Sequence, residues 1–117
     1  MDISVGAEYV IANALILQSK KGVNEVSFDQ LRNIGWKIQQ QCNKTGVDAI
    51  ILTSGLNLKA AVYDFSDYFE YVNTGEPMIR IKKSVPIATL KKRFIYYLPP
   101  DVAEAIKEGT VSYFKAS

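Results

Sequence analysis

Histidine is absent from this sequence of 117 residues, and cysteine occurs once, as Cys42. The absence of imidazole removes the most common general base and metal ligand, and a single thiol can form neither an intrachain disulfide nor a thiolate zinc site. The seven glycines are never closer than nine residues apart, which excludes the glycine-rich loops that bind phosphates and dinucleotides. We therefore expect a protein that is not an enzyme and that holds no metal or cofactor.

Two serines stand in partial catalytic patterns. Ser54 follows a strand-like run, as the serine of a nucleophile elbow does, but Leu52 occupies a position where that elbow needs glycine. Ser112 and Lys115 have the spacing of a serine–lysine pair, yet they lie within six residues of the last residue, where fraying would disturb the geometry. We interpret Ser54 as part of a turn and assign neither serine a catalytic role.

Three acidic residues would share a face if their segment were helical: Asp64, Asp67 and Glu70. Carboxylates at this spacing can hold a divalent cation, but the spacing is not specific for a metal site. We interpret the three residues as a solvated acidic face.

Long apolar runs are also missing. The most apolar stretch, Val10–Leu17, has eight residues, less than half the length that spans a bilayer. A secretory signal carries basic residues before its apolar run, whereas Asp2 and Glu8 precede this one. We expect a cytoplasmic protein that does not contact a membrane.

The size of 13.1 kDa and 48% hydrophobic residues predict a single globular domain over residues 1–117.

The first predicted element is a helix from Ser4 to Ser19, ended by Gly22. One apolar stripe along it contains Ile3, Ala7, Val10, Ala14 and Leu17. A second stripe, on roughly the opposite side, contains Val5, Tyr9, Ala12 and Ile16. Both sides of this helix therefore require burial.

A second helix is predicted from Ser27 to Asn43, because Ser27 and Gln30 have the spacing of a capping box. Its inward residues are Leu31, Ile34, Ile38 and Cys42. Gly35 weakens the middle of this helix and is also compatible with a turn between two shorter helices.

The remaining pattern predicts strands followed by helices. Strand-like runs occupy Val47–Thr53, Leu58–Phe65, Tyr68–Val72 and Met78–Lys82, although Tyr68–Val72 is equally compatible with one helical turn. A helix beginning near Pro86 and ending before Pro99, a short helix over Asp101–Glu108 stopped by Gly109, and an edge strand over Val111–Phe114 complete the chain.

The predicted fold class is α+β. Two N-terminal helices precede an antiparallel sheet of about four strands, and the C-terminal helical segment packs on one face of that sheet.

Our main functional hypothesis is protein binding without catalysis. The two-striped first helix leaves one stripe to meet a partner or a second copy of the chain. The candidate interface residues are therefore Val5, Tyr9, Ala12 and Ile16. Coverage of this stripe by the chain's own C-terminal elements is an equal alternative. A regulatory or adaptor protein that forms a homodimer fits this hypothesis.

The alternative hypothesis is nucleic-acid binding through the segment between Pro77 and Pro100, which has six basic and no acidic residues. The candidate residues on strand and helix are Arg80, Lys82, Lys92, Arg93 and Tyr96. A winged-helix arrangement is one form of this hypothesis. It needs a strand at Val23–Val26, a turn at Gly35, a recognition helix over Trp36–Asn43 and a hairpin wing.

Overall fold

The computed structural model describes residues 3–45, 67–93 and 100–115, with side chains described in 8–41, 67–93 and 100–115. Within these ranges the chain forms four helices and a three-stranded antiparallel sheet, so the predicted α+β class is confirmed. The elements are α1 (Ile3–Ser19), β1 (Glu25–Ser27), α2 (Phe28–Thr45), β2 (Phe69–Asn73), β3 (Pro77–Ile81), α5 (Ile87–Arg93) and α6 (Pro100–Lys115).

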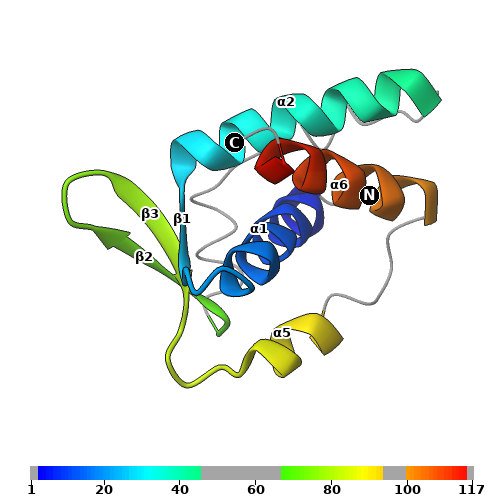
Figure 1. The fold of residues 1–117 in the computed structure, drawn as a ribbon. Helices are drawn as coiled ribbons and strands as arrows, with labels where there is room; N and C mark the ends of the chain where they lie inside the picture. The colour runs from blue at the N-terminus through cyan, green and yellow to red at the C-terminus, as the bar shows by residue number, and fades with distance from the viewer. Residues whose placement is uncertain (1–2, 46–66, 94–99, 116–117) are drawn as a thin grey trace.

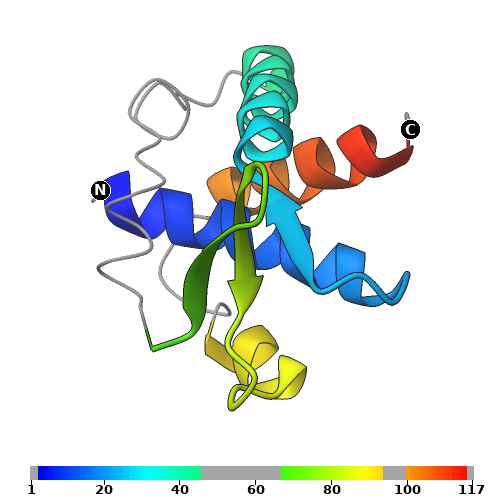
Figure 2. The same cartoon turned by 90° about the vertical axis from the view of Figure 1, so that its left-hand side faces the viewer.

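Helix α1 lies in the middle of the fold. Figures 1 and 2 show α2 and α6 on one side of it, α5 on the opposite side and the sheet across a third. Its side chains are buried around the helix, including Val10, Ile11, Ala14 and Leu15. A helix that is apolar on all sides is stable only when it is surrounded, which is why this one is central.

The end of α1 is closed by the predicted glycine. Gly22 has a φ of +77°, and the backbone N–H of Val23 donates to the carbonyl of Gln18 at 3.0 Å while that of Gly22 donates to Ser19 at 3.1 Å. These two bonds form a Schellman motif, which needs a residue that tolerates a left-handed backbone.

The predicted capping box begins α2. The backbone N–H of Gln30 donates to Ser27 Oγ at 3.0 Å, and the backbone N–H of Ser27 donates to Gln30 Oε1 at 2.9 Å. The helix then continues through Gly35 without a break. The winged-helix form with a turn at Gly35 and a separate recognition helix over Trp36–Asn43 is therefore wrong, because these residues extend the same helix.

The described sheet has the strand order β1-β3-β2. Glu70 lies opposite Arg80 and Tyr71 opposite Ile79, and Gly75 with a φ of +136° stands in the turn between β2 and β3. Residues 69–73 are therefore strand, which decides the alternative left open for Tyr68–Val72. The two helices do not both precede the sheet, because β1 lies between them in the chain and pairs with β3.

The C-terminal helix is longer than predicted. Helix α6 continues from Pro100 to Lys115 through Gly109, so both the helix end at Gly109 and the edge strand over Val111–Phe114 are wrong. An alanine-like Cβ on Gly109 would lie 2.7 Å from Ile38 Cα, so glycine serves here to let α6 approach α2 closely.

Three predicted segments lie outside the described residues: the strands Val47–Thr53 and Leu58–Phe65 and the end of the helix before Pro99. The predicted number of about four strands therefore stays a prediction. In the part of the chain that the structure describes, no helix combines the length and the apolar character needed to span a membrane.

Candidate nucleic-acid interface

Arg80 lies in the middle strand of the described sheet and is neutralised by a neighbour. Its Nε donates to Glu70 Oε1 at 2.6 Å, across the β2–β3 pair in which the two residues are directly opposite. Both side chains are about one-third exposed, at 33% and 34%. Because this charge already has a counterion, Arg80 is a weaker phosphate contact than its place in the basic segment predicts.

Arg93, the last residue of α5, is held against the sheet. Its Nε donates to the Tyr68 hydroxyl at 3.2 Å, and its guanidinium lies 5.6 Å from the centre of the Tyr68 ring. A guanidinium over an aromatic face combines cation–π attraction with packing. Arg93 therefore connects α5 to the residue that precedes β2, and these contacts stabilise the fold.

Most lysines of the segment are more exposed than its two arginines. Lys83 is exposed in the turn after β3, and Lys91 and Lys92 are exposed on α5, whose Leu90 is buried in the core. Lys82 is half-buried, and its backbone N–H donates to the Tyr68 carbonyl at 3.0 Å. Among the described residues none of these four lysines forms an ion pair. Tyr96 lies outside the described residues.

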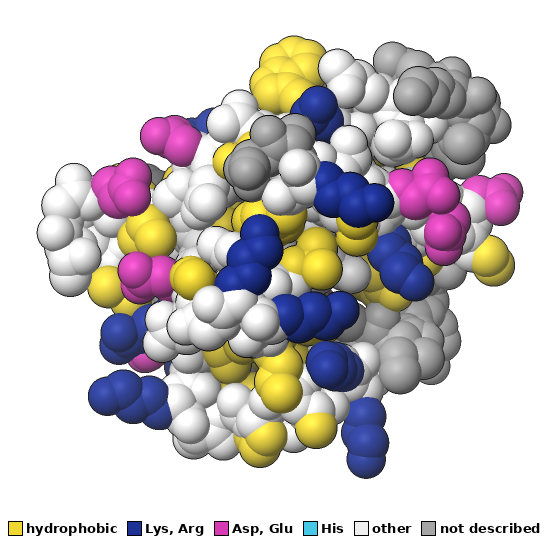
Figure 3. All heavy atoms as spheres, in the orientation of Figure 1, with side chains coloured by type: hydrophobic (Ala, Val, Ile, Leu, Met, Phe, Trp, Pro, Cys, Tyr) yellow, Lys and Arg dark blue, Asp and Glu magenta, His cyan; other side chains and the backbone are white. Residues whose placement is uncertain are grey.

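The basic surface is wider than the predicted segment. Figure 3 shows Lys and Arg side chains across the middle and lower part of one face, over α6, α5 and the end of α1, with acidic side chains toward its two sides. Outside the predicted segment, the exposed lysines are Lys107 and Lys115 of α6 and Lys20 and Lys21 in the turn that follows α1. Lys21 lies 5.4 Å from the Phe114 ring centre, which brings the end of α1 to α6.

Comparison with known proteins adds no relative. No protein-family model matches the sequence, and no curated protein or solved structure is similar to it.

The candidate dimer residues lie mostly inside the protomer. Ala12 has 0% exposed surface, and Tyr9 and Ile16 are half-buried against the core. Val5 is in α1, but its side chain lies outside those described. Helices α6 and α5 of the same chain contact α1. These contacts agree with the alternative prediction that C-terminal elements of the chain cover α1. Ala12 offers no surface to a second copy.

A shallow groove of about 490 Å³ runs between α2 and α6. It is lined by Gln41, Glu104, Lys107, Glu108, Val111, Ser112 and Lys115. Ser112 and Lys115 therefore share this groove within one helix, although the sequence analysis expected fraying there. Two carboxylates and two ammonium groups balance the charge of the lining, which gives the groove no strong preference for an ion of one sign.

Glu8 is the buried charge that sequence analysis missed. Its side chain is 1% exposed, and no hydrogen bond reaches its buried Oε1 in the described structure. Burial raises the pKa of Glu8 from 4.5 to about 7, and the positive charge of Arg93 partly opposes this rise. The sequence did contain a signal for this burial. Glu8 has helical spacing from Ile11, Leu15 and Gln18, so all four residues fall on one side of α1.

The acidic triplet does not form the helical face that its spacing suggested. Glu70 lies in β2 and binds Arg80, while Asp67 is exposed in the turn before that strand. Asp64 lies outside the described residues. The described residues hold no cluster of three metal-ligating side chains.

Proposed function

We propose that this protein binds nucleic acid, without catalysing a reaction, through the lysines that follow β3. The observation that carries the proposal is that Lys83, Lys91 and Lys92 are exposed and form no ion pair with any described residue. Exposed cations of this kind bind phosphates by releasing the counterions of the nucleic acid.

Two features of the structure favour phosphate binding by α5. Buried Leu90 anchors the helix, so the lysines beside it are turned outward. The basic last turn also stands at the negative end of the helix dipole, which stabilises α5 while its charges face solvent. Arg80 and Arg93, both proposed from the sequence as contacts, have partners within the protein, Glu70 and Tyr68, so the proposal does not depend on them.

A salt titration of oligonucleotide binding tests this proposal. We expect the slope of log affinity against log salt concentration to shrink by about 0.7 to 0.9 for each lysine replaced in Lys91→Ala/Lys92→Ala. Glu70→Gln/Arg80→Gln removes both charges of one ion pair and leaves the net charge unchanged, so it is the matched control and should leave the slope nearly unchanged. Fluorescence anisotropy of a labelled oligonucleotide measures both.

Absence of binding at low salt would refute nucleic-acid binding. Binding with the same salt dependence in the parent and in the double lysine variant would show that α5 is not the contact.

Protein binding, including self-association, is the second proposal, and Tyr71 is the observation that favours it. Tyr71 is 49% exposed, and its ring centre lies 5.8 Å from that of Phe28. It belongs to β2, which lies at the edge of the described sheet. Edge strands pair readily with strands of other chains.

Light scattering tests self-association through this edge. We expect a mass of two chains at high micromolar concentration and of one chain for Tyr71→Lys, because lysine on an edge strand opposes pairing. A parent protein that stays monomeric at every concentration would contradict self-association.

A further inference from the structure

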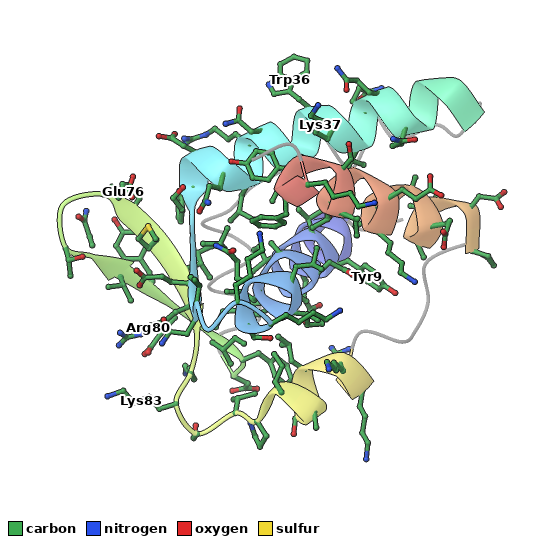
Figure 4. All side chains as sticks on the ribbon, in the orientation of Figure 1. Tyr9, Trp36, Lys37, Glu76, Arg80 and Lys83 are labelled. Atoms are coloured by element: carbon green, nitrogen blue, oxygen red, sulfur yellow. The ribbon has the colours of Figure 1, made fainter. Side chains whose placement is uncertain are left out.

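Trp36 is an exposed aromatic residue in the middle of a well-formed helix. It is the one tryptophan of the chain, and 71% of its surface is exposed. Figure 4 shows the indole standing out from α2, away from the other helices. Tryptophan is on average a highly buried residue, so this exposure requires an explanation.

The face of α2 around Trp36 is polar. The inward face of the helix carries Leu31, Ile34 and Ile38, which have no exposed surface. The outward face carries Asp29, Arg32, Asn33 and Gln40 beside the indole. Docking sites for proteins are contiguous apolar patches with aromatic anchors inside them. A single ring among polar side chains does not provide such a patch.

Basic side chains lie beside this ring on α2 and on the adjoining face of the molecule. Lys37 follows Trp36 in α2, and Lys107 and Lys115 of α6 line the groove that α2 borders through Gln41. Figure 4 shows the indole above α2, and Figure 3, in the same orientation, shows Lys and Arg side chains over the face below this position. An open aromatic ring beside cations is the combination that binds a base by stacking and the adjoining phosphates by charge.

We propose that Trp36 stacks on a base of single-stranded nucleic acid whose backbone follows this basic face. The proposal rests on the nucleic-acid binding proposed above and adds the class of nucleic acid that is bound. An unpaired base exposes its flat surface to the indole, whereas in a duplex neighbouring bases cover that surface. Single strands should therefore bind in preference to duplexes.

The single tryptophan makes the contact directly observable. An oligothymidylate of roughly 15 nucleotides, near the upper end of known site sizes of about 4–16, serves as the probe. Its 5′ label reports binding by anisotropy, and Trp36 emission reports stacking in a parallel titration with unlabelled strand. We expect Trp36 fluorescence to be quenched as this strand binds. An abasic strand with the same phosphates should bind without quenching.

Substitution of Trp36 separates stacking from charge. We expect Trp36→Ala to lower the affinity for oligothymidylate by about 5- to 140-fold, with an unchanged salt slope because the indole carries no charge. Trp36→Phe should recover much of the affinity. Thr74→Ala, an exposed change in the turn between β2 and β3, is the control and should bind as the parent does. Unchanged thermal unfolding of Trp36→Ala would confirm that the folded protein is compared.

Four outcomes would overturn the stacking proposal. Binding with no fluorescence change and equal affinity in Trp36→Ala would leave nucleic-acid binding intact and remove Trp36 from it. Duplex bound as tightly as the single strand would show recognition of the backbone alone. A blue shift of Trp36 emission with rising protein concentration, but none with oligonucleotide, would place the indole between two copies of the chain. Absence of any oligonucleotide binding refutes the proposed function as well.

Discussion

Gly109→Ala is expected to lower the free energy of unfolding by about 1 to 3 kcal/mol, the usual cost of inserting a methyl group where there is no space. The new Cβ would lie 2.7 Å from both Cα and Cγ1 of Ile38 and 2.8 Å from its backbone nitrogen. A side-chain end can rotate away, but the Ile38 backbone is fixed within α2. The two helices must therefore separate, and the contact between α2 and α6 is the most extensive between elements of the described fold.

The sign of this effect makes the test decisive. In an exposed helix interior, replacing glycine by alanine stabilises the helix by roughly 1 kcal/mol, because alanine loses less backbone entropy on folding. Urea unfolding followed by circular dichroism measures the free energy of unfolding. Lys107→Ala, an exposed change in the same turn of α6, is the control and should lie within about 0.5 kcal/mol of the parent. Increased stability of Gly109→Ala would contradict the close crossing of α2 and α6.

Gly109 also illustrates what a sequence leaves undecided. Glycine after a helical stretch is a common stop signal, and it ends α1 in that way at Gly22. The same residue type permits close packing of two helices at Gly109, and only the position of Ile38 distinguishes the two uses. Buried Thr110, whose hydroxyl donates to the Ile106 carbonyl at 2.7 Å, follows Gly109 within the same helix.

Local signals predicted the local structure well. The capping box of Ser27 and Gln30 and the inward residues Leu31, Ile34 and Ile38 of α2 depend on residues close together in sequence, and the structure confirms them. The side chain of Cys42, the fourth predicted inward residue, lies outside those described. The burial of Ala12 did not follow from its stripe, because coverage of α1 depends on helices that come much later in the chain.

The candidate interface was predictable only in part. Exposure of Lys92 on α5 follows from the helical period once Leu90 is buried. The pairing of Arg80 with Glu70 was also accessible, because a hairpin turning at Gly75 places these two residues opposite each other. The lysines of α6 and of the end of α1 join the same face through tertiary packing, and no short-range pattern encodes that.

A second large effect is expected at Glu8, whose burial makes stability depend on pH. The pKa of about 7 in the folded protein exceeds the ordinary value of 4.5, so the folded state holds this proton more tightly than the unfolded state does. The contribution of Glu8 to stability is then greatest below pH 4.5, decreases as the pH rises toward about 7 and levels off above it. The difference between the two pKa values corresponds to a loss of about 3 kcal/mol.

Glu8→Gln should remove this loss, because a neutral amide of the same shape has no proton to release. We expect the stability of Glu8→Gln relative to the parent to increase by about 3 kcal/mol between about pH 4 and about pH 8. Urea unfolding at a series of pH values measures this relative change, which is independent of any constant cost of the amide. Glu8→Ala, which also removes the side-chain volume, should be less stable throughout but show the same change with pH. Parallel pH profiles for the parent and Glu8→Gln would show that the carboxyl group of Glu8 does not retain its proton in the folded protein.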